Sequence, residues 1–185
     1  MTEPLMTEPE IRELVADDEP AVREFFARMP AEDRTFFQQD VEDPKVIAAW
    51  AGDEQRIRRC AVDEDGRLLA IAALRPGSDW TSHVADLVLL VSPEARRRKL
   101  GRTMARVMLI EAVQHGLMKV TVMIAADNAA AIDMFRAIGF EPEALLRDQL
   151  RNPDDGTLRD TVVLAHLVED NWAGMIAGGF QEVLS

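Results

Sequence analysis

The stretch from Val84 to Arg106 constrains the fold more than any other part of the chain. It begins as an apolar run, Val84 to Val91, which a single acid, Asp86, interrupts. A turn follows at residues 92–95, and a cationic segment then leads into apolar residues with helical spacing. This order predicts a buried strand, a loop and a helix whose first turn lies in that loop.

The cationic segment predicts a phosphate-binding site. Its five cationic side chains belong to Arg96, Arg97, Arg98, Lys99 and Arg102. The backbone N–H groups of a first helical turn have no partner inside the helix, and the helix dipole is positive there. We therefore expect the loop and the start of the helix to bind a small polyanion.

Composition limits the classes of function. The chain has 185 residues, which suits one domain, and its formal net charge is −12. Cationic side chains supply most of a protein's affinity for nucleic acids. We therefore expect a chain with this net negative charge to have no nucleic-acid partner. The overall negative field favours a cationic acceptor, such as an amine.

Composition also predicts the location of the protein and the absence of a metal site. The sequence has no apolar run long enough to span a membrane and no N-terminal signal peptide, so we expect a cytoplasmic protein without membrane contact. The single cysteine, Cys60, suits a reducing compartment and falls in an expected strand, which favours a buried structural thiol. No Cys/His cluster has metal-ligand spacing, so we expect no metal.

The chain divides into a flexible leader at residues 1–9, an α/β domain at residues 10–167 and a C-terminal tail or helix at residues 168–185. The apolar tail is expected to pack on the domain or, in a homodimer, on the second subunit. Within the domain, apolar runs and periodicity predict seven strands and four helices. The expected strands span residues 11–15, 57–62, 68–74, 84–91, 119–126, 145–150 and 161–167, and the expected helices span residues 17–29, 44–50, 100–115 and 129–138.

The cationic loop resembles a signature of the GCN5-related N-acetyltransferases, the GNAT superfamily. The run Arg96-x-x-Lys99-x-Gly101 is similar to the family's Q/R-x-x-G-x-G/A motif. Lys99 stands where the family usually has its first glycine. A positive φ there would cost a lysine about 1 kcal/mol, whereas an ordinary φ would cost little.

Two later motifs and the order of elements extend the resemblance to residues 11–167. Asn128-x-x-Ala131 is similar to the family's pantetheine motif, and Gly139-Phe140 closes the following helix as in the family. Arg159-Asp160 resembles the final hairpin of the family's bacterial members.

The resemblance implies an acyl-CoA N-acyltransferase fold, with a mixed, mostly antiparallel sheet of about seven strands, splayed at its middle and flanked by about four helices. It implies acetyl-CoA as cosubstrate, with the pyrophosphate on the loop and the thioester beside a bulged central strand. One backbone N–H of that strand would point at the thioester carbonyl. The residues that the resemblance assigns to acetyl-CoA are Leu89, Leu90, Val91, Arg96, Arg97, Arg98, Lys99, Leu100, Gly101, Arg102, Thr103, Asn128 and Phe135.

Two residues are candidates for the base that takes a proton from the attacking amine. Asp86 interrupts an apolar strand, and carboxylates in apolar surroundings hold protons more tightly. Protein-lysine acetyltransferases of the family have a glutamate near this place. The alternative is that Asp86 faces solvent or bonds a neighbouring backbone group. His83 is the second candidate because imidazoles titrate near neutral pH, although such a histidine is more often a surface or structural residue.

The proton donor for the departing thiolate is absent from its usual place. The family commonly has tyrosine at the position of Phe135, and this chain contains no tyrosine. We expect Phe135 to pack against the pantetheine arm and water to supply the proton, which would slow the reaction without abolishing it.

The expected function is acetyl transfer from acetyl-CoA to a primary amine, on a small cationic metabolite or a protein lysine, by direct attack in a ternary complex. The acids at residues 32–43 are expected to form a solvated loop, although the resemblance implies that this region overhangs the acceptor site and receives a cationic amine. The alternative function is a non-catalytic module that binds or senses acyl-CoA, which Lys99 and Phe135 favour.

Overall fold

The structure is a computed structural model that describes residues 8–34, 41, 43–53, 55–152 and 155–168. The expected leader and tail lie almost entirely outside these residues, and so does the expected packing of the tail on the domain or on a second subunit. Most of the acidic stretch at residues 32–43 also lies outside them.

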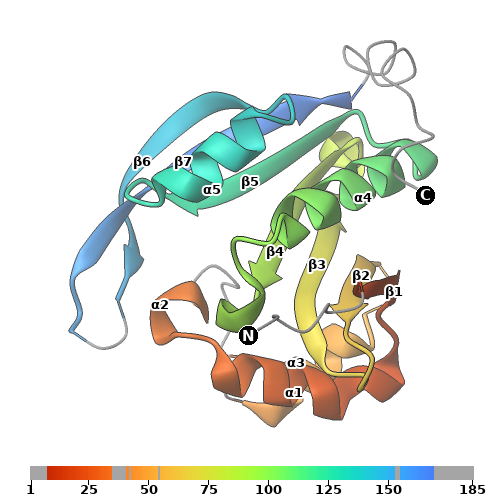
Figure 1. Cartoon of the computed structure of the whole chain (residues 1–185). Coiled ribbons are helices and arrows are strands. Elements are labelled where there is room, and N and C mark those ends of the chain that lie inside the picture. Colours follow the sequence, from red (N-terminus) through yellow and green to blue (C-terminus); the bar gives the residue numbers. More distant parts are fainter. Residues whose placement is uncertain (1–7, 35–40, 42, 54, 153–154, 169–185) are drawn as a thin grey trace.

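The described part of the chain forms one sheet of seven strands (Figure 1). The order across the sheet is β1-β2-β3-β4-β5-β7-β6, and every neighbouring pair is antiparallel except β4 and β5. This arrangement confirms the expected mixed, mostly antiparallel sheet. The strands are β1 (Glu10–Glu13), β2 (Ile57–Val62), β3 (Leu68–Pro76), β4 (Val84–Val91), β5 (Lys119–Ala125), β6 (Glu141–Arg151) and β7 (Leu158–Leu167).

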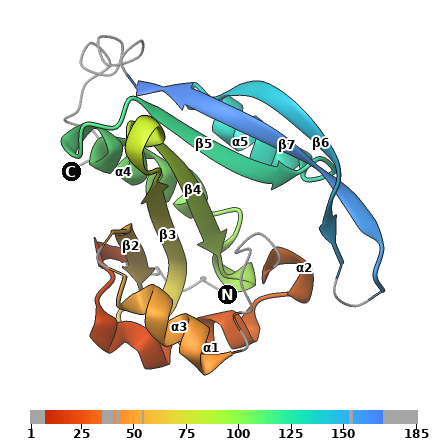
Figure 2. The ribbon, with the colours of Figure 1, turned by 180° about the vertical axis from the view of Figure 1, so that it is seen from behind.

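Helices cover both faces of the sheet (Figures 1 and 2). Helices α1 and α3 pack on one face, and α4 and α5 pack on the other. The α-helices are α1 (Glu19–Arg28), α2 (Ala31–Arg34), α3 (Pro44–Ala51), α4 (Leu100–Gln114) and α5 (Ala129–Arg136), and the short 3-10 turns are η1 (Ala16–Asp18), η3 (Asp79–Thr81) and η4 (Pro93–Ala95). The four longer helices are those expected from the sequence, and α2 is a single added turn.

Each face of the sheet carries its own hydrophobic core. The core beneath α4 and α5 contains Leu87 of β4, whereas the core beneath α1 and α3 contains Leu90 of the same strand. Because successive side chains of a strand point to opposite faces, the apolar run of β4 serves both cores.

β4 and β5 separate into a fork halfway along their length. Their parallel pairing joins Val84 to Lys119 at one end and stops at Leu87 and Val122. Beyond that point β4 pairs only with β3, and β5 pairs only with β7, so the two strands diverge (Figure 2). The expected splay is therefore present, and it leaves backbone groups of β4 without a β5 partner.

The expected bulge in the central strand is not found in its pairing with β3. The register runs without a shift from the pair Ala70–Val91 to the pair Pro76–Ala85. The fork needs no bulge here, because each strand is held by a different neighbour on its outer side.

Glycines end α4 and α5, and three strands, β3, β6 and β7, are longer than expected. Gly116 and Gly139 have positive φ values of 70° and 91° just past the ends of α4 and α5, as helix-terminating glycines do. β6 begins four residues before the expected position, and it contains Pro142, which an edge strand tolerates.

Cys60 is fully buried, and burial raises the pKa of its thiol to about 11, which confirms a structural thiol. Within the described residues, no helix is both long enough and apolar enough to cross a membrane. The same residues contain no group of three or more His, Cys, Asp or Glu side chains that could hold a metal ion.

Candidate active site

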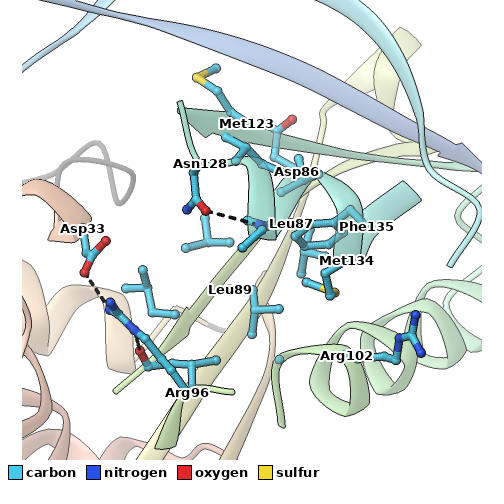
Figure 3. Close-up of a pocket in the computed structure, with 18 of the residues that line it drawn as sticks. Asp33, Asp86, Leu87, Leu89, Arg96, Arg102, Met123, Asn128, Met134 and Phe135 are labelled. Carbon is cyan, nitrogen blue, oxygen red and sulfur yellow. Dashed lines mark hydrogen bonds and ion pairs between the residues drawn. The ribbon is translucent and has the colours of Figure 1, made fainter. Parts of the chain in front are cut away.

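A cavity of about 750 Å³ occupies the fork between β4 and β5 (Figure 3). Both strands, the cationic loop and helices α4 and α5 contribute to its walls, and its size is typical of a site for a small molecule or cofactor. The residues assigned from the sequence that line it are Asp86, Leu89, Leu90, Val91, Arg96, Arg97, Lys99, Gly101, Arg102, Asn128 and Phe135. The assigned residues that do not line it are His83, Arg98, Leu100 and Thr103.

Backbone groups of β4 face the fork only at alternate residues. The N–H of Ser92, just after β4, donates to the carbonyl oxygen of Leu69 in β3 at 2.8 Å. In the regular ladder that continues along β4, the N–H of Leu90 also points toward β3. The N–H groups of Leu89 and Val91 therefore point into the fork, where pairing with β5 has ended. Of the three residues assigned to the thioester, Leu90 lines the cavity without offering it a backbone N–H.

The cationic loop bends through two residues in the left-handed conformation. Arg97 and Lys99 both have a φ of 64°. This conformation costs a non-glycine residue about 1–2 kcal/mol. Of the two possibilities considered from the sequence, Lys99 therefore has the positive φ, which is the less favourable one. Backbone strain of this kind concentrates at functional sites, where the surrounding structure holds it in place.

The first turn of α4 faces the cavity directly after this loop. Lys99 is the N-cap residue and makes no side-chain capping bond, so its side chain satisfies none of the N–H groups of the first turn. Gly101 and Arg102 line the cavity, whereas Leu100 is buried in the core. The hydroxyl of Thr103 donates to the Lys99 carbonyl at 3.4 Å, which turns it away from a ligand role.

Arg96 ties the loop to β4 and to α2 (Figure 3). Its Nε donates to the carbonyl oxygen of Val91 at 3.1 Å, and its Nη2 forms an ion pair with Asp33 Oδ2 at 2.6 Å. Asp33 is one of the acids expected in a solvated loop or at an amine site. The structure instead pairs it with Arg96 of the cationic loop, and its side chain is only 23% exposed.

Helix α5 forms the opposite wall of the cavity. Asn128 caps this helix, and its side-chain oxygen accepts a hydrogen bond from the N–H of Ala131 at 3.2 Å. Phe135 is buried and contacts the ring of Phe140 edge-on, with 5.0 Å between the ring centroids. Phe135 thus offers the cavity an apolar surface with no proton donor.

His166 supports this wall from behind. Burial lowers its pKa, so the neutral ring is favoured, and Nδ1 donates to the Gly139 carbonyl at 3.1 Å. The ring also lies 5.2 Å from that of Phe140. His166 therefore has a structural role behind the cavity wall.

Asp86 is not buried, which corrects the premise for choosing it. Its side chain is 56% exposed, and it faces the same side of the sheet as Val88 and Leu90. The core beneath α1 and α3 includes Leu90 and Val88 but not Asp86. Asp86 accepts hydrogen bonds from Arg75 Nη2 at 2.8 Å and from the Thr121 hydroxyl at 2.6 Å, and it lines the cavity.

The structure does not bring His83 to the cavity. Its side chain is exposed, and its backbone carbonyl accepts bonds from the N–H groups of Met118 and Lys119. It therefore lies just before β4, at the paired end of β4 and β5, which is the closed end of the fork. This position does not support His83 as the base.

The sequence analysis missed a row of polar side chains that crosses the sheet beside Asp86. Arg75 on β3 pairs with Asp86, and Asp86 pairs with Thr121 on β5. Arg56 directly precedes β2. The first residue of β2, Ile57, pairs with Leu74, so the same register places Arg56 opposite Arg75. All four side chains line the cavity. Only the register between strands could have revealed this polar row, because its members are far apart in the sequence.

Comparisons with known proteins bear on the same fold. The sequence profile described as "Acetyltransferase (GNAT) family" matches residues 10–140, whereas no curated protein matches the chain. Ribosomal-protein-alanine N-acetyltransferase from Brucella melitensis superimposes with a TM-score of 0.75 at 22% identity, over 85% of this chain and 99% of that one. A GCN5-related N-acetyltransferase from Kribbella flavida gives 0.73 at 22% identity, over 86% and 98%. A phosphinothricin acetyltransferase from Sinorhizobium meliloti, in complex with AcCoA, gives 0.74 at 18% identity, over 87% and 89%.

The solved structures agree in fold, and the profile covers more than half of the chain, including β4, the cationic loop and α5. GNAT enzymes bind acetyl-CoA and transfer its acetyl group to an amine. The chain therefore belongs to the GNAT acetyltransferase family and is an acetyl-CoA-dependent acyltransferase.

Proposed function

We propose that residues 10–167 form an N-acetyltransferase domain in which a primary amine attacks the acetyl-CoA thioester directly, within a ternary complex. The observation that carries this proposal is the fork, where the N–H groups of Leu89 and Val91 face a cavity that begins at the cationic loop. The described residues that line the cavity include no Cys, Ser or His, which are common covalent nucleophiles. Direct attack therefore fits this cavity better than a covalent enzyme intermediate.

The cationic loop and the start of α4 would hold the pyrophosphate. The side chains of Arg97, Lys99 and Arg102 line this end of the cavity, and the uncapped N–H groups of α4 add the positive end of its dipole. The pantetheine arm would then lie in the fork between Leu89 and Phe135.

The N–H of Leu89 would stabilise the negative charge that develops on the thioester oxygen. A fixed backbone donor in a site with little water is an effective oxyanion stabiliser, because it needs no reorganisation during the reaction. The apolar side chains of β4 around it limit the access of water.

Asp86 would accept the proton of the amine through water. It precedes Leu89 by three residues, about 10 Å along an extended strand, which is too far for direct transfer. The hydrogen bonds from Arg75 and Thr121 fix the orientation of the carboxylate. The new C–N bond forms as the C–S bond breaks, the amine proton moves toward Asp86, and solvent protonates the thiolate.

The direct test is release of free thiol from acetyl-CoA in the presence of a panel of primary amines, with and without the protein. We expect protein-dependent release with at least one amine and a higher melting temperature when acetyl-CoA binds. We also propose that the acceptor is a small molecule or a protein lysine. We further propose that the protein is cytoplasmic and has no nucleic-acid partner.

A second candidate function is an acyl-CoA sensor without turnover, which the apolar wall at Phe135 favours because it offers no proton to the thiolate. Stabilisation by acetyl-CoA without thiol release from any amine would support the sensor. Absence of stabilisation would contradict both functions.

A further inference from the structure

The acceptor end of the cavity is defined by the polar row of Arg56, Arg75, Asp86 and Thr121. Paired residues on neighbouring strands point to the same face, so these side chains stand together where the core beneath α1 and α3 ends. The opposite end of the cavity belongs to the phosphate loop. An amine that approaches the thioester from the face of α1 and α3 therefore meets this row.

The charges of the row do not suit an acceptor that is only cationic. Asp86 is the one carboxylate in the row, and it already accepts a hydrogen bond from Arg75. Asp33, which lines the same cavity, is paired with Arg96. At either of these carboxylates a polyamine would have to displace an arginine, and at Asp86 it would meet the positive charge of Arg75. The third carboxylate of the lining, Asp133, belongs to α5 on the opposite wall and not to the row.

Arg75 has the capacity to bind an anion. A guanidinium carries five N–H donors in a planar fork, and Arg75 uses Nη2 for Asp86. Among the described residues, the structure records no other partner for its remaining donors. The side chain is 48% exposed and lines the cavity. Arg56, the other arginine of the row, is held by Asp53 at 2.7 Å and is only 15% exposed.

We propose that the acceptor is a small amine that also carries a carboxylate, with the carboxylate bound by Arg75 and the amine directed toward the fork. The proposal rests on the proposed acetyl transfer and narrows its acceptor from cationic amines to aminocarboxylates. Side-by-side positive and negative groups match such a zwitterion, because Arg75 takes the carboxylate while Asp86 interacts with the amine through water. The reaction forms an amide C–N bond, breaks the thioester C–S bond and leaves the carboxylate unchanged.

Binding of the carboxylate would also change the surroundings of the base. Arg75 would turn part of its hydrogen bonding from Asp86 to the substrate, whereas the hydroxyl of Thr121 would keep Asp86 in place. Arg75 is thus a specificity residue, and its removal should act on KM for aminocarboxylates more than on kcat.

The test compares amines in matched sets on the full-length protein with saturating acetyl-CoA. Each set contains an aminocarboxylate, its carboxamide and the unsubstituted amine of the same chain length, for example glycine, glycinamide and ethylamine, or 4-aminobutyrate, 4-aminobutanamide and butylamine. 1,4-Diaminobutane serves as the purely cationic acceptor. We expect kcat/KM to be at least about tenfold higher for the carboxylate member of one set, since a charge-assisted hydrogen bond is lost in the others.

The variant Arg75→Gln should abolish this preference by raising KM for the carboxylate alone. Its kcat should fall by a similar factor with the carboxylate and with the amide, because both reactions lose the contact that orients Asp86. Arg75→Lys should restore part of the preference, because it keeps the charge without the planar fork. Arg23→Gln, which alters an exposed arginine of α1, is the matched control and should behave like the wild type. Melting temperatures identify any variant that has unfolded. If Arg75→Gln is unfolded, the inference is judged from the matched acceptor sets with the wild-type protein.

The outcomes separate this inference from the proposed function. Thiol release that is as fast with amides or the diamine as with carboxylates would overturn the inference and leave acetyl transfer standing. A carboxylate preference that survives Arg75→Gln in a folded protein would overturn the assignment of Arg75. No thiol release with any amine would overturn the proposed function and the inference with it.

Discussion

The two ends of the cavity are built in different ways. The phosphate-binding part of the end that we assign to acetyl-CoA comes from one continuous segment, in which β4, the cationic loop and α4 follow one another from Val84 to Gln114, and α5 adds the wall at Phe135. The acceptor end comes from the polar row, whose members lie on or beside four strands and extend from Arg56 to Thr121. The first end carries backbone strain at Arg97 and Lys99, whereas no member of the row has a positive φ.

This difference predicts that the acetyl-CoA half tolerates side-chain substitutions better than the acceptor half. A continuous loop at a helix start binds phosphates mainly through backbone N–H groups, so many side chains can change around it. A row across strands recognises its ligand through side chains, so one substitution in any strand can change the acceptor. The predictions below test the two ends separately, from the largest expected effect to the smallest.

Gly101→Glu should cause the largest loss, and the loss should be confined to the acetyl-CoA end. A carboxylate in the first turn of α4 would face the pyrophosphate, and the juxtaposition of like charges costs several kcal/mol. The affinity for acetyl-CoA, measured by calorimetry, should fall at least about a hundredfold. Gly101→Ala is the matched control, because its methyl group would meet Val91 Cγ2 at an ordinary 3.6 Å. Equal affinity of the Glu and Ala variants would refute the assignment of the loop.

Asp86→Asn should affect the acceptor end and leave acetyl-CoA binding intact. Loss of a catalytic base should lower kcat on the order of a hundredfold near neutral pH. The loss should shrink as the pH rises toward about 10, where an alkyl amine is neutral without help. Thr121→Val keeps the carboxylate and removes one of its hydrogen bonds, so its effect should be much smaller. A pH–rate profile of unchanged height and shape for Asp86→Asn would remove Asp86 from the mechanism.

Phe135→Tyr should improve the acetyl-CoA end by adding the proton donor that this wall lacks. Phe135 lines the cavity in which we place the pantetheine arm, so a phenol at this position would bring a hydroxyl to that wall. We expect kcat to rise about three- to tenfold, less than a typical general acid supplies, because a CoA thiolate already leaves readily. Phe135→Leu controls for loss of the ring and should give no increase. An unchanged kcat for the tyrosine variant would show that thiolate protonation does not limit the rate.

Lys99→Gly should give the smallest effect, a gain in stability at the strained loop. Glycine adopts the observed φ of 64° without the penalty of a side chain, which is worth about 1 kcal/mol. The melting temperature should rise by about 2–4 °C relative to Lys99→Ala, which removes the charge but keeps the strain. Equal melting temperatures of these two variants would contradict the strained conformation of the loop.

The acetyl-CoA end could be predicted from the sequence because its signals are local. The apolar run, the basic residues from Arg96 to Arg102 and the helix-capping Asn128 each define a short element, and the structure has these elements at the expected places. The conformation of Lys99 could not be predicted, since lysine is compatible with either sign of φ at different costs. The structure shows that the φ of Lys99 is positive.

The acceptor end could not be predicted because it depends on strand register and on where a core ends. Asp86 lies in an apolar strand, but the core beneath α1 and α3 stops at Val88, so the apolar neighbours in the sequence do not bury it. Arg75 and Thr121 become its partners only through pairing with β3 and β5. Asp33 likewise gained a partner, Arg96, that no spacing in the sequence suggests.

The central claim is that the fork receives the thioester, with its carbonyl oxygen on the N–H of Leu89. A crystal structure of the protein with acetyl-CoA, or with an unreactive thioether analogue, tests this claim most directly. We predict that the pyrophosphate lies on the loop from Arg96 to Arg102, and that the acyl oxygen lies within about 3 Å of Leu89 N. A pantetheine arm outside the fork, or a β4 that is paired with β5 along its whole length, would contradict the account.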